Sequence, residues 1–330
     1  MLPPGNLYYR RGCERHGRMA MHVTSTHGDA PTRGCPTMGC ANSHHLQRVE
    51  PRPRQAAPPA GGAVERGQEQ GQQPPPHPDH LTLLNITAGT EAAAAAEVLS
   101  QGRTEANVFE LAAKALELAQ QAIEQVLART PPESRPACRA GCAFCCAIPV
   151  AVSPPEALYI AAYMQKTLSP EAQVDLHTRL RARVEERQGA TADALRAQKR
   201  FCLFLRDDRQ CGIYPIRPLA CRGYNSMSRS ACEEAFTDQG DRVHMHAGVR
   251  ELAAGVIYGL ILASKQLGLE WGRYELDAAV LRALDTPDAA ERWARGERVF
   301  AGCDQIAMPP HVAERIMALP HVSGSQGTTP

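Results

Sequence analysis

The sequence predicts a mainly α-helical protein, in which helices form a scaffold around a loop-rich region that binds metal through cysteine, with a disordered N-terminal tail. Eight of the twelve cysteines lie between Cys138 and Cys232. Alanine is abundant and aromatic residues make up only 5% of the chain, which favours helix over sheet. Proline and glycine make up more than a quarter of residues 1–80, too much for a packed core.

Charge and hydropathy exclude two classes of partner. The formal net charge of the 330 residues is +1, so there is no global electrostatic reason to expect nucleic acid or a membrane surface. The longest apolar run, Leu252 to Ala263, is shorter than the ~20 residues that a bilayer requires. No secretory signal is evident, so we expect a cytoplasmic protein with reduced thiols. The cysteine spacing then indicates metal binding rather than disulfides.

Residues 1–80 are expected to be a disordered tail. Only six of them are Leu, Ile, Val or Phe, too few to offset the entropy of ordering the segment. Three cysteines and seven histidines occur here, but they are scattered without the spacing of a metal site. An alternative to a tail is a gene start assigned too far upstream, with Met1 not the true initiator.

The rest of the chain divides by composition into four further segments. Helical character is expected from near Thr90, and order is expected to fade from Ala301, where Pro and Gly return. The predicted segments are a helical segment (81–133), the cysteine-cluster metal-binding domain (134–235), C-terminal helices packing on that domain (236–300) and a mostly disordered tail (301–330).

The most distinct helix is predicted from Thr104 to Arg129. Apolar residues recur there at steps of three and four, and Pro131 and Pro132 follow its end. We expect the apolar face to pack on the rest of the fold, and a dimerising helix is the alternative. The residues of this face are Val108, Leu111, Ala115, Leu118, Ala122 and Val126.

Helix starts are marked by capping signals. Ser153, Pro154 and Glu156 fit the N-cap, first helical position and capping box, and Ser169 with Pro170 repeats the pattern. Gly255 and Gly259, four residues apart, would let a neighbouring helix approach closely. Helices are predicted over residues 154–166, 169–188, 191–200, 249–267, 275–284 and 286–293.

The cysteine segment carries the chemistry. It opens with Cys138-x3-Cys142-x2-Cys145-Cys146. Thiolates at two- and three-residue spacing on loops can converge on a soft metal ion. One zinc or cubane iron–sulfur site takes four ligands, so eight cysteines exceed one site. The predicted ligands are Cys138, Cys142, Cys145, Cys146, Cys202, Cys211, Cys221 and, with the weakest support, Cys232.

Cys145 and Cys146 are adjacent, and adjacent side chains point apart. Either each serves a different metal centre, or one bridges two centres, or one is a free redox-active thiol. The sequence leaves these three arrangements open.

Cationic and aromatic residues near the cysteines are candidates for supporting the site. Arg217 and Arg222 flank Cys221, and a thiolate centre carries a net negative charge that needs such donors. Arg200 precedes Cys202 in the same way. Tyr214, like Tyr224, is placed to cover the site and exclude water. The alternatives are ordinary surface arginines and core tyrosines.

Other candidate residues carry weaker signals. His244 and His246 form a possible second ligand pair, although a loop is the simpler interpretation. Asp207-Asp208 is interpreted as a solvated turn, and Cys303 as a buried thiol. The chain has neither a G-x-G-x-x-G fingerprint after a strand nor a P-loop, so it carries no sign of a nucleotide cofactor.

Taken together, the cysteine quartet, Cys202-Leu-Phe-Leu and Cys211-Gly-Ile-Tyr-Pro-Ile-Arg-Pro-Leu-Ala-Cys221-Arg222 resemble the YkgJ-type cysteine-cluster proteins of bacteria, also called the CxxCxxCC, or zinc- or iron-chelating, domain. The likeness covers residues 134–235. It implies metal chelation by the cysteines from Cys138 to Cys221. The first gap here has three residues where the family pattern has two, which weakens the assignment of Cys138. Cys232 lies beyond the core motif.

The sequence therefore predicts a metal-chelating protein whose cofactor is a zinc ion or an iron–sulfur cluster. The metal is expected to structure the domain, with about 10 kcal/mol or more of folding free energy, and to support redox chemistry or metal handling. The alternative is an enzyme, either an iron–sulfur oxidoreductase or, because one branch of the family resembles flagellin lysine N-methylases, a protein lysine N-methylase. A third hypothesis is an interaction module that binds a protein partner or forms a homodimer.

Overall fold

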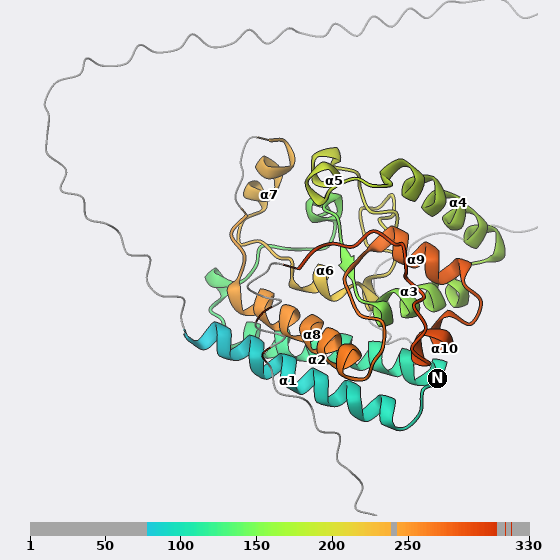
Figure 1. Cartoon of the computed structure of the whole chain (residues 1–330). Helices are drawn as coiled ribbons and strands as arrows, with labels where there is room; N and C mark the ends of the chain where they lie inside the picture. Colours follow the sequence, from blue (N-terminus) through green and yellow to red (C-terminus); the bar gives the residue numbers. More distant parts are fainter. Residues whose placement is uncertain (1–77, 239–242, 309–313, 315–317, 319–330) are drawn as a thin grey trace, which may run out of the picture. The chain divides into compact units, whose positions relative to one another are not determined.

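The computed structural model describes residues 78–238 and 243–308, together with residues 314 and 318. Helices make up most of the described chain, which confirms the predicted mainly α-helical class (Figure 1). The helices are α1 (Pro78–Ser100), α2 (Glu105–Arg129), α3 (Pro154–Thr167), α4 (Pro170–Arg187), α5 (Ala192–Gln198), α6 (Leu219–Gly223), α7 (Arg229–Phe236), α8 (Ala247–Gln266), α9 (Leu276–Asp285) and α10 (Ala289–Ala294).

Short elements connect these helices. The 3₁₀ turns of the described residues are η1 (Pro132–Ser134), η2 (Phe144–Ala147) and η3 (Tyr214–Ile216). Two strands of two residues each, β1 (Ala151–Val152) and β2 (Tyr274–Glu275), pair antiparallel, with Ala151 opposite Glu275. The strand pair joins the segment that follows Cys146 to the residues that precede α9.

Close packing of α1 on α8 forms one side of the molecule (Figure 1). The predicted close approach at two glycines is confirmed. A Cβ at Gly259 would lie 2.5 Å from the Cβ of Glu91 and 2.6 Å from the carbonyl oxygen of Ala88, and one at Gly255 would lie 2.8 Å from the carbonyl oxygen of Leu84. Glycine at both positions therefore sets the distance between the two helices.

The sequence predicted that helical structure begins near Thr90, but α1 begins at Pro78. The first turns of α1 contain Pro78 and Thr87, and their intrinsic helix propensity is modest. Leu84 and Ala88 are nevertheless buried in the core, so packing against α8 supplies the stability that propensity does not. The predicted tail over residues 1–80 otherwise lies outside the described residues.

α2 confirms the predicted helix closely. Thr104 is its N-cap, and the Thr104 hydroxyl accepts a hydrogen bond from the backbone N–H of Asn107. Its apolar face packs against α8, α3 and α1, so this face belongs to the core of one chain. The buried residues of α2 are Val108, Leu111, Ala112, Ala115, Leu116, Ala119 and Ile123.

The predicted capping signals are also confirmed. Glu156 accepts hydrogen bonds from the backbone N–H and the hydroxyl of Ser153, both at 2.8 Å, which closes the capping box of α3. Ser169 caps α4 and Thr191 caps α5 through their hydroxyls. α4 is amphipathic, with Leu176 and Leu180 buried.

α8 is the core helix. It is the one described helix long and apolar enough to cross a membrane by composition, and 78% of that apolar window is buried inside the protein. It contacts α1, α2 and α6, while α9 packs on α3 and α4. Trp293 of α10 is fully buried and donates through Nε1 to the carbonyl oxygen of Glu270 at 2.8 Å.

Residues 301–308 extend the described fold beyond α10. Ile306 donates its backbone N–H to the carbonyl oxygen of Arg273 at 2.8 Å, and Gln305 forms a bridge with Tyr274. The predicted loss of order from Ala301 therefore does not apply to these eight residues. Most of the remaining predicted C-terminal tail lies outside the described residues.

Candidate metal centre

The eight predicted ligands lie on short segments between the long helices. Cys138, Cys142, Cys202 and Cys211 lie on loops, as expected. The other four lie on short helical turns, which the sequence prediction did not include. Cys145 and Cys146 belong to η2, Cys221 to α6 and Cys232 to α7.

Backbone hydrogen bonds join these segments although they are far apart in sequence. The N–H of Cys202 donates to the carbonyl oxygen of Cys146 at 2.7 Å, and the N–H of Ala137 donates to that of Ser226 at 2.8 Å. A bridge between Leu205 and Cys211 closes a tight turn. α7 also packs on η2. The chain therefore holds the cysteine segments together through its own backbone.

A first group of thiols, Cys138 and Cys232, lies at Ser226. The backbone N–H of Ser226 donates to the sulfur of Cys138 at 3.3 Å. Burial raises the pKa of Cys138, and the neighbouring thiols of Cys145, Cys142 and Cys232 raise it further. The pKa of Cys232 is raised by burial and by Cys142 and Cys145, while a hydrogen bond to Ser226 opposes the shift. Ser226 therefore stands between Cys138 and Cys232.

A second group consists of Cys202, Cys211 and Cys221. Burial raises the pKa of Cys221 to about 12, and the thiols of Cys145 and Cys211 add to the shift. The pKa of Cys202 is raised by burial, then by Asp277, Cys221 and Cys211. These mutual effects place the three sulfurs within electrostatic range of one another.

Cys145 belongs to the surroundings of both groups. Its pKa is raised by a hydrogen bond with Cys146 and by burial. Its charge also raises the pKa of Cys138 and Cys232 in the first group and of Cys211 and Cys221 in the second. The Cys145 sulfur thus lies within electrostatic range of thiols in both groups.

All eight thiols are free, and none forms a disulfide in the described chain. Within residues 78–238 and 243–308, no three His, Cys, Asp or Glu side chains converge closely enough to hold a metal ion as they stand. Coordination would therefore require the thiols to deprotonate and their side chains to turn towards a common point. The assignment of the eight cysteines as ligands stays a prediction.

Arg217 supports the fit of this region to a metal–thiolate centre. Its guanidinium lowers the pKa of Cys145, Cys211 and Cys221, so it lies within electrostatic range of these three sulfurs. Its Nε is buried and has no hydrogen-bond partner. A buried cationic donor without a partner is costly unless an anion lies nearby, and a thiolate is the anion this site can supply.

The two tyrosines considered from the sequence differ in position. Tyr214 is 59% exposed, and its ring stacks on the Arg217 guanidinium at 4.5 Å. It covers the arginine rather than the sulfurs. Burial raises the pKa of Tyr224, and the charges of Cys232, Cys145 and Cys138 raise it further, which places its hydroxyl beside the first group.

Arg222 and Arg200 have structural partners. Arg222 donates to the carbonyl oxygens of Arg217 and Pro215 and to Oε1 of Gln120 at 2.7 Å, so it fastens the cysteine region to α2. Burial lowers the pKa of Arg222 to about 10, and Cys221 is a minor influence on it. Arg200 forms an ion pair with Glu186.

Glu156 links the core to the cysteine region. One carboxylate oxygen closes the capping box of α3, while the other accepts the backbone N–H of Leu219 at 2.8 Å. Leu219 begins α6, two residues before Cys221. The capping box was visible in the sequence, but nothing there indicated the second bond. Sequence reasoning also missed Ser226, since a serine in a loop carries no signal of its own.

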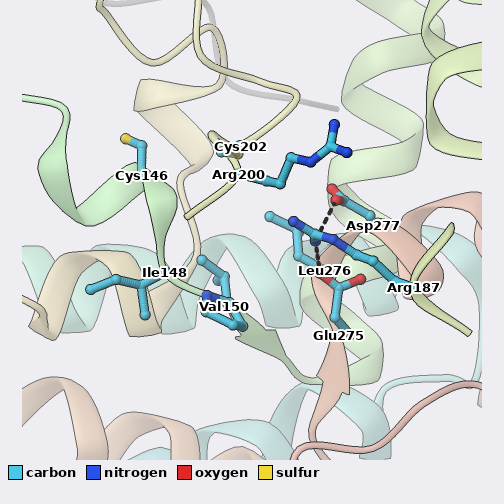
Figure 2. Close-up of a pocket in the computed structure, with 10 residues that line it drawn as sticks. Cys146, Ile148, Val150, Arg187, Arg200, Cys202, Glu275, Leu276 and Asp277 are labelled. Carbon is cyan, nitrogen blue, oxygen red and sulfur yellow. Dashed lines mark hydrogen bonds and ion pairs between the residues drawn. The ribbon is translucent and has the colours of Figure 1, made fainter. Parts of the chain in front are cut away.

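A small open pocket borders the second group on the side of α4 and α9. Figure 2 shows Arg187 directed between the carboxylates of Glu275 and Asp277, and its Nη1 lies 3.2 Å from an oxygen of each. Cys146 and Cys202 also line the pocket. Burial raises the pKa of Glu275 and of Asp277, and Arg187 opposes both shifts. No sequence motif indicated this pocket.

The weaker candidates have simple local roles. His246 caps α8 through Nδ1, which accepts the backbone N–H of Val249, and its Nε2 lies 3.2 Å from the hydroxyl of Thr130. Asp208 pairs with Arg206 in the exposed turn of residues 206–210. Cys303 is partly buried, and its sulfur contacts the carbonyl oxygen of Ala278 at 3.9 Å.

Comparison with known families supports the interpretation of the cysteines. Residues 137–242 match a family model described as "CxxCxxCC: Putative zinc- or iron-chelating domain". The match covers about a third of the chain and includes all eight predicted ligands, from Cys138 to Cys232. It confirms the resemblance inferred from the cysteine motif. No curated protein and no solved structure matches the chain.

Proposed function

We propose that residues 137–242 bind zinc or iron through cysteine thiolates, and that the metal serves first to order this part of the chain. The observation that carries the proposal is the position of Arg217, whose buried Nε lacks a partner and whose charge acts on the free thiols of Cys145, Cys211 and Cys221. Six of these thiols have raised pKa values, mostly through burial and mutual repulsion. A bound metal cation would lower these pKa values, because its charge stabilises the thiolates and offsets their mutual repulsion.

Local charge supports the same proposal. Residues 196–231 contain eight Lys or Arg but only two Asp, whereas the whole chain is nearly neutral. Thiolates that coordinate a divalent ion leave a net negative charge, which nearby cations stabilise. The excess of positive charge therefore fits a region that carries metal-bound thiolates. Because these ligands must remain reduced, we also propose a cytoplasmic location.

The structural role is tested by removing the metal. Elements of the cysteine region are short, with α6 spanning five residues and α7 eight, so they depend on tertiary contacts for stability. Strong chelation should make residues 137–238 sensitive to protease and lower the helical circular dichroism in part. α1, α2 and α8 have their own apolar contacts and should stay protected.

The outcome of this test shows whether the metal structures the region or is bound without ordering it. If protease resistance and circular dichroism are unchanged after complete metal removal, the metal does not structure the region. A control with the same chelator already saturated with zinc would show that any loss of structure comes from metal removal.

A second candidate function is redox chemistry or metal handling, and the pocket beside Cys146 and Cys202 favours it. This pocket has room for about one water molecule beside the ion pairs of Arg187 with Glu275 and Asp277. Anaerobically purified protein that is brown and bleaches on reduction would support an iron–sulfur oxidoreductase. Saturable binding of a methyl donor would support the methylase alternative, and a stable dimer or co-purifying partner would support the interaction module.

A further inference from the structure

We propose that α4 clamps the segment that carries Cys202, with Arg183 and Arg179 as positioning residues, so that the docking of α4 and metal binding at Cys202 stabilise each other. This inference rests on the proposed metal-binding function. It adds a helix that controls the position of one predicted ligand and that responds when the metal binds.

α4 is held to the rest of the protein largely by charged side chains. Of its 18 residues, Leu176, Leu180 and Arg187 are buried, and Val174 on the same helix is 67% exposed. A helix that buries so little apolar surface gains little stability from packing. Its position therefore depends on the partners of its charged groups.

Two of these charged groups hold the backbone on either side of Cys202. Arg179 and Arg183 lie four residues apart, so they share one face of α4. Arg183 donates through Nη1 to the carbonyl oxygen of Phe201 at 3.2 Å. Arg179 donates through Nη2 to the carbonyl oxygen of Leu203 at 3.3 Å. One face of α4 thus binds the residues immediately before and after a predicted ligand.

Two further contacts fix the same segment. Glu186, in the last turn of α4, forms an ion pair with Arg200. The backbone N–H of Cys202 donates to the carbonyl oxygen of Cys146, in η2, at 2.7 Å. Residues 200, 201 and 203 are therefore held by α4, while residue 202 is held by the turn that carries two other predicted ligands.

Arg183 is the central contact of this clamp. Its side chain is 12% exposed, and it also lies 3.9 Å from the carboxylate of Asp277 in the first turn of α9. A hydrogen bond from a charged donor that is shielded from water is stronger than an exposed one. The Arg179 side chain is 48% exposed, so water competes for its bond. We therefore expect the loss of Arg183 to have the larger effect.

The clamp links α4 to the metal in both directions. A ligand whose backbone is already fixed loses less conformational freedom when it coordinates, so the clamp raises the affinity for the metal. Linkage then requires that a metal bound through Cys202 stabilises the docked position of α4 by the same factor.

The test uses the full chain, reduced and free of oxygen, without metal and with zinc. Zinc affinity is measured by competition with a chromophoric chelator, and amide hydrogen exchange is read in peptides over residues 170–187 and 199–206. Arg183→Met removes the donors and keeps the apolar stem. Arg181→Met is the matched control, because Arg181 loses the same charge from the same helix but pairs with Asp285 of α9 at 3.8 Å.

Arg183→Met should weaken zinc affinity about 10-fold or more and should speed exchange over residues 199–206 in the metal-free protein. Arg179→Met should do both to a smaller extent, and Arg181→Met should do neither. In the wild type, zinc should slow exchange over residues 170–187, and Arg183→Met should reduce this protection. If Arg183→Met does not fold by circular dichroism, the exposed Arg179→Met carries the same comparison with Arg181→Met.

The outcomes separate the clamp from the proposed function. Equal losses of affinity in Arg183→Met and Arg181→Met would show that charge alone acts, and would overturn the clamp. Weaker affinity with unchanged exchange over residues 199–206 would also overturn it. Zinc binding that leaves exchange over residues 170–187 unchanged would refute the linkage to α4. A wild-type chain that takes up neither zinc nor iron would instead overturn the proposed function.

Discussion

Replacing Gly259 by alanine tests how tightly α1 packs on α8. The new Cβ would lie 2.5 Å from the Cβ of Glu91 and 2.6 Å from the carbonyl oxygen of Ala88. Neither atom is the end of a flexible side chain, so α1 as a whole must shift. Overpacking of this kind costs about 1–3 kcal/mol. Alanine recovers about 1 kcal/mol in helix propensity, so we expect a net loss of about 0–2 kcal/mol.

Urea denaturation followed by circular dichroism at 222 nm measures this change. Gly89→Ala is the matched control, because Gly89 lies in α1 and a Cβ there would meet nothing within 4 Å. It should stabilise the protein by about 0.5–1 kcal/mol through helix propensity alone. If Gly259→Ala stabilises the protein as much as Gly89→Ala does, the close packing of α1 on α8 is wrong.

Three further predictions concern polar groups around the core and the cysteines. Glu156→Ala should lower the free energy of unfolding by about 2–4 kcal/mol in urea, because Ser153 and the buried N–H of Leu219 lose their acceptor. A loss below about 0.5 kcal/mol, the range of a surface substitution, would refute this role of Glu156. Burial raises the pKa of Glu91 from 4.5 to about 8, so between these values the folded state holds a proton that the unfolded chain releases. The free energy of unfolding should therefore fall as the pH rises from 5 to 8, and Glu91→Gln should remove on the order of a few kcal/mol of this dependence. Parallel pH profiles of the two proteins would contradict this role of Glu91. Arg217→Met should weaken zinc affinity about 10–100-fold, measured by competition with a chromophoric chelator, and should leave the far-ultraviolet circular dichroism unchanged. An unchanged affinity would show that Arg217 does not support the centre.

The helical scaffold could be predicted wherever the signal was local. Thr104, Ser153 and Ser169 cap their helices as the sequence indicated, because a side-chain oxygen three residues before a free N–H needs no tertiary context. The first turns of α1 were missed, because their helicity depends on contact with α8. α6 and α7 were missed because Gly212, Pro215, Pro218 and Gly223 favour turns in this part of the chain, so it was expected to form loops.

The cysteines of the candidate site could be recognised from the sequence, but their arrangement could not. The cysteine spacing indicated metal chemistry, and residues 137–242 match a family described by that chemistry. Which sulfur lies near which depends on contacts between distant residues, such as Ser226 with Cys138 and Glu156 with Leu219. The charge beside Cys221 was expected from sequence for both Arg217 and Arg222. The fold assigns it mainly to Arg217, because the Arg222 donors are taken by two carbonyl oxygens and Gln120.

Metal content is the most direct test of thiolate coordination. The measurement is elemental analysis of the full chain purified without oxygen, combined with its visible absorption spectrum. We predict stoichiometric zinc in colourless protein or stoichiometric iron with broad absorbance, retained through gel filtration and lost after strong chelation. Full-chain protein that is folded, reduced and free of both metals, and that takes up neither on reconstitution, would contradict metal binding by these cysteines.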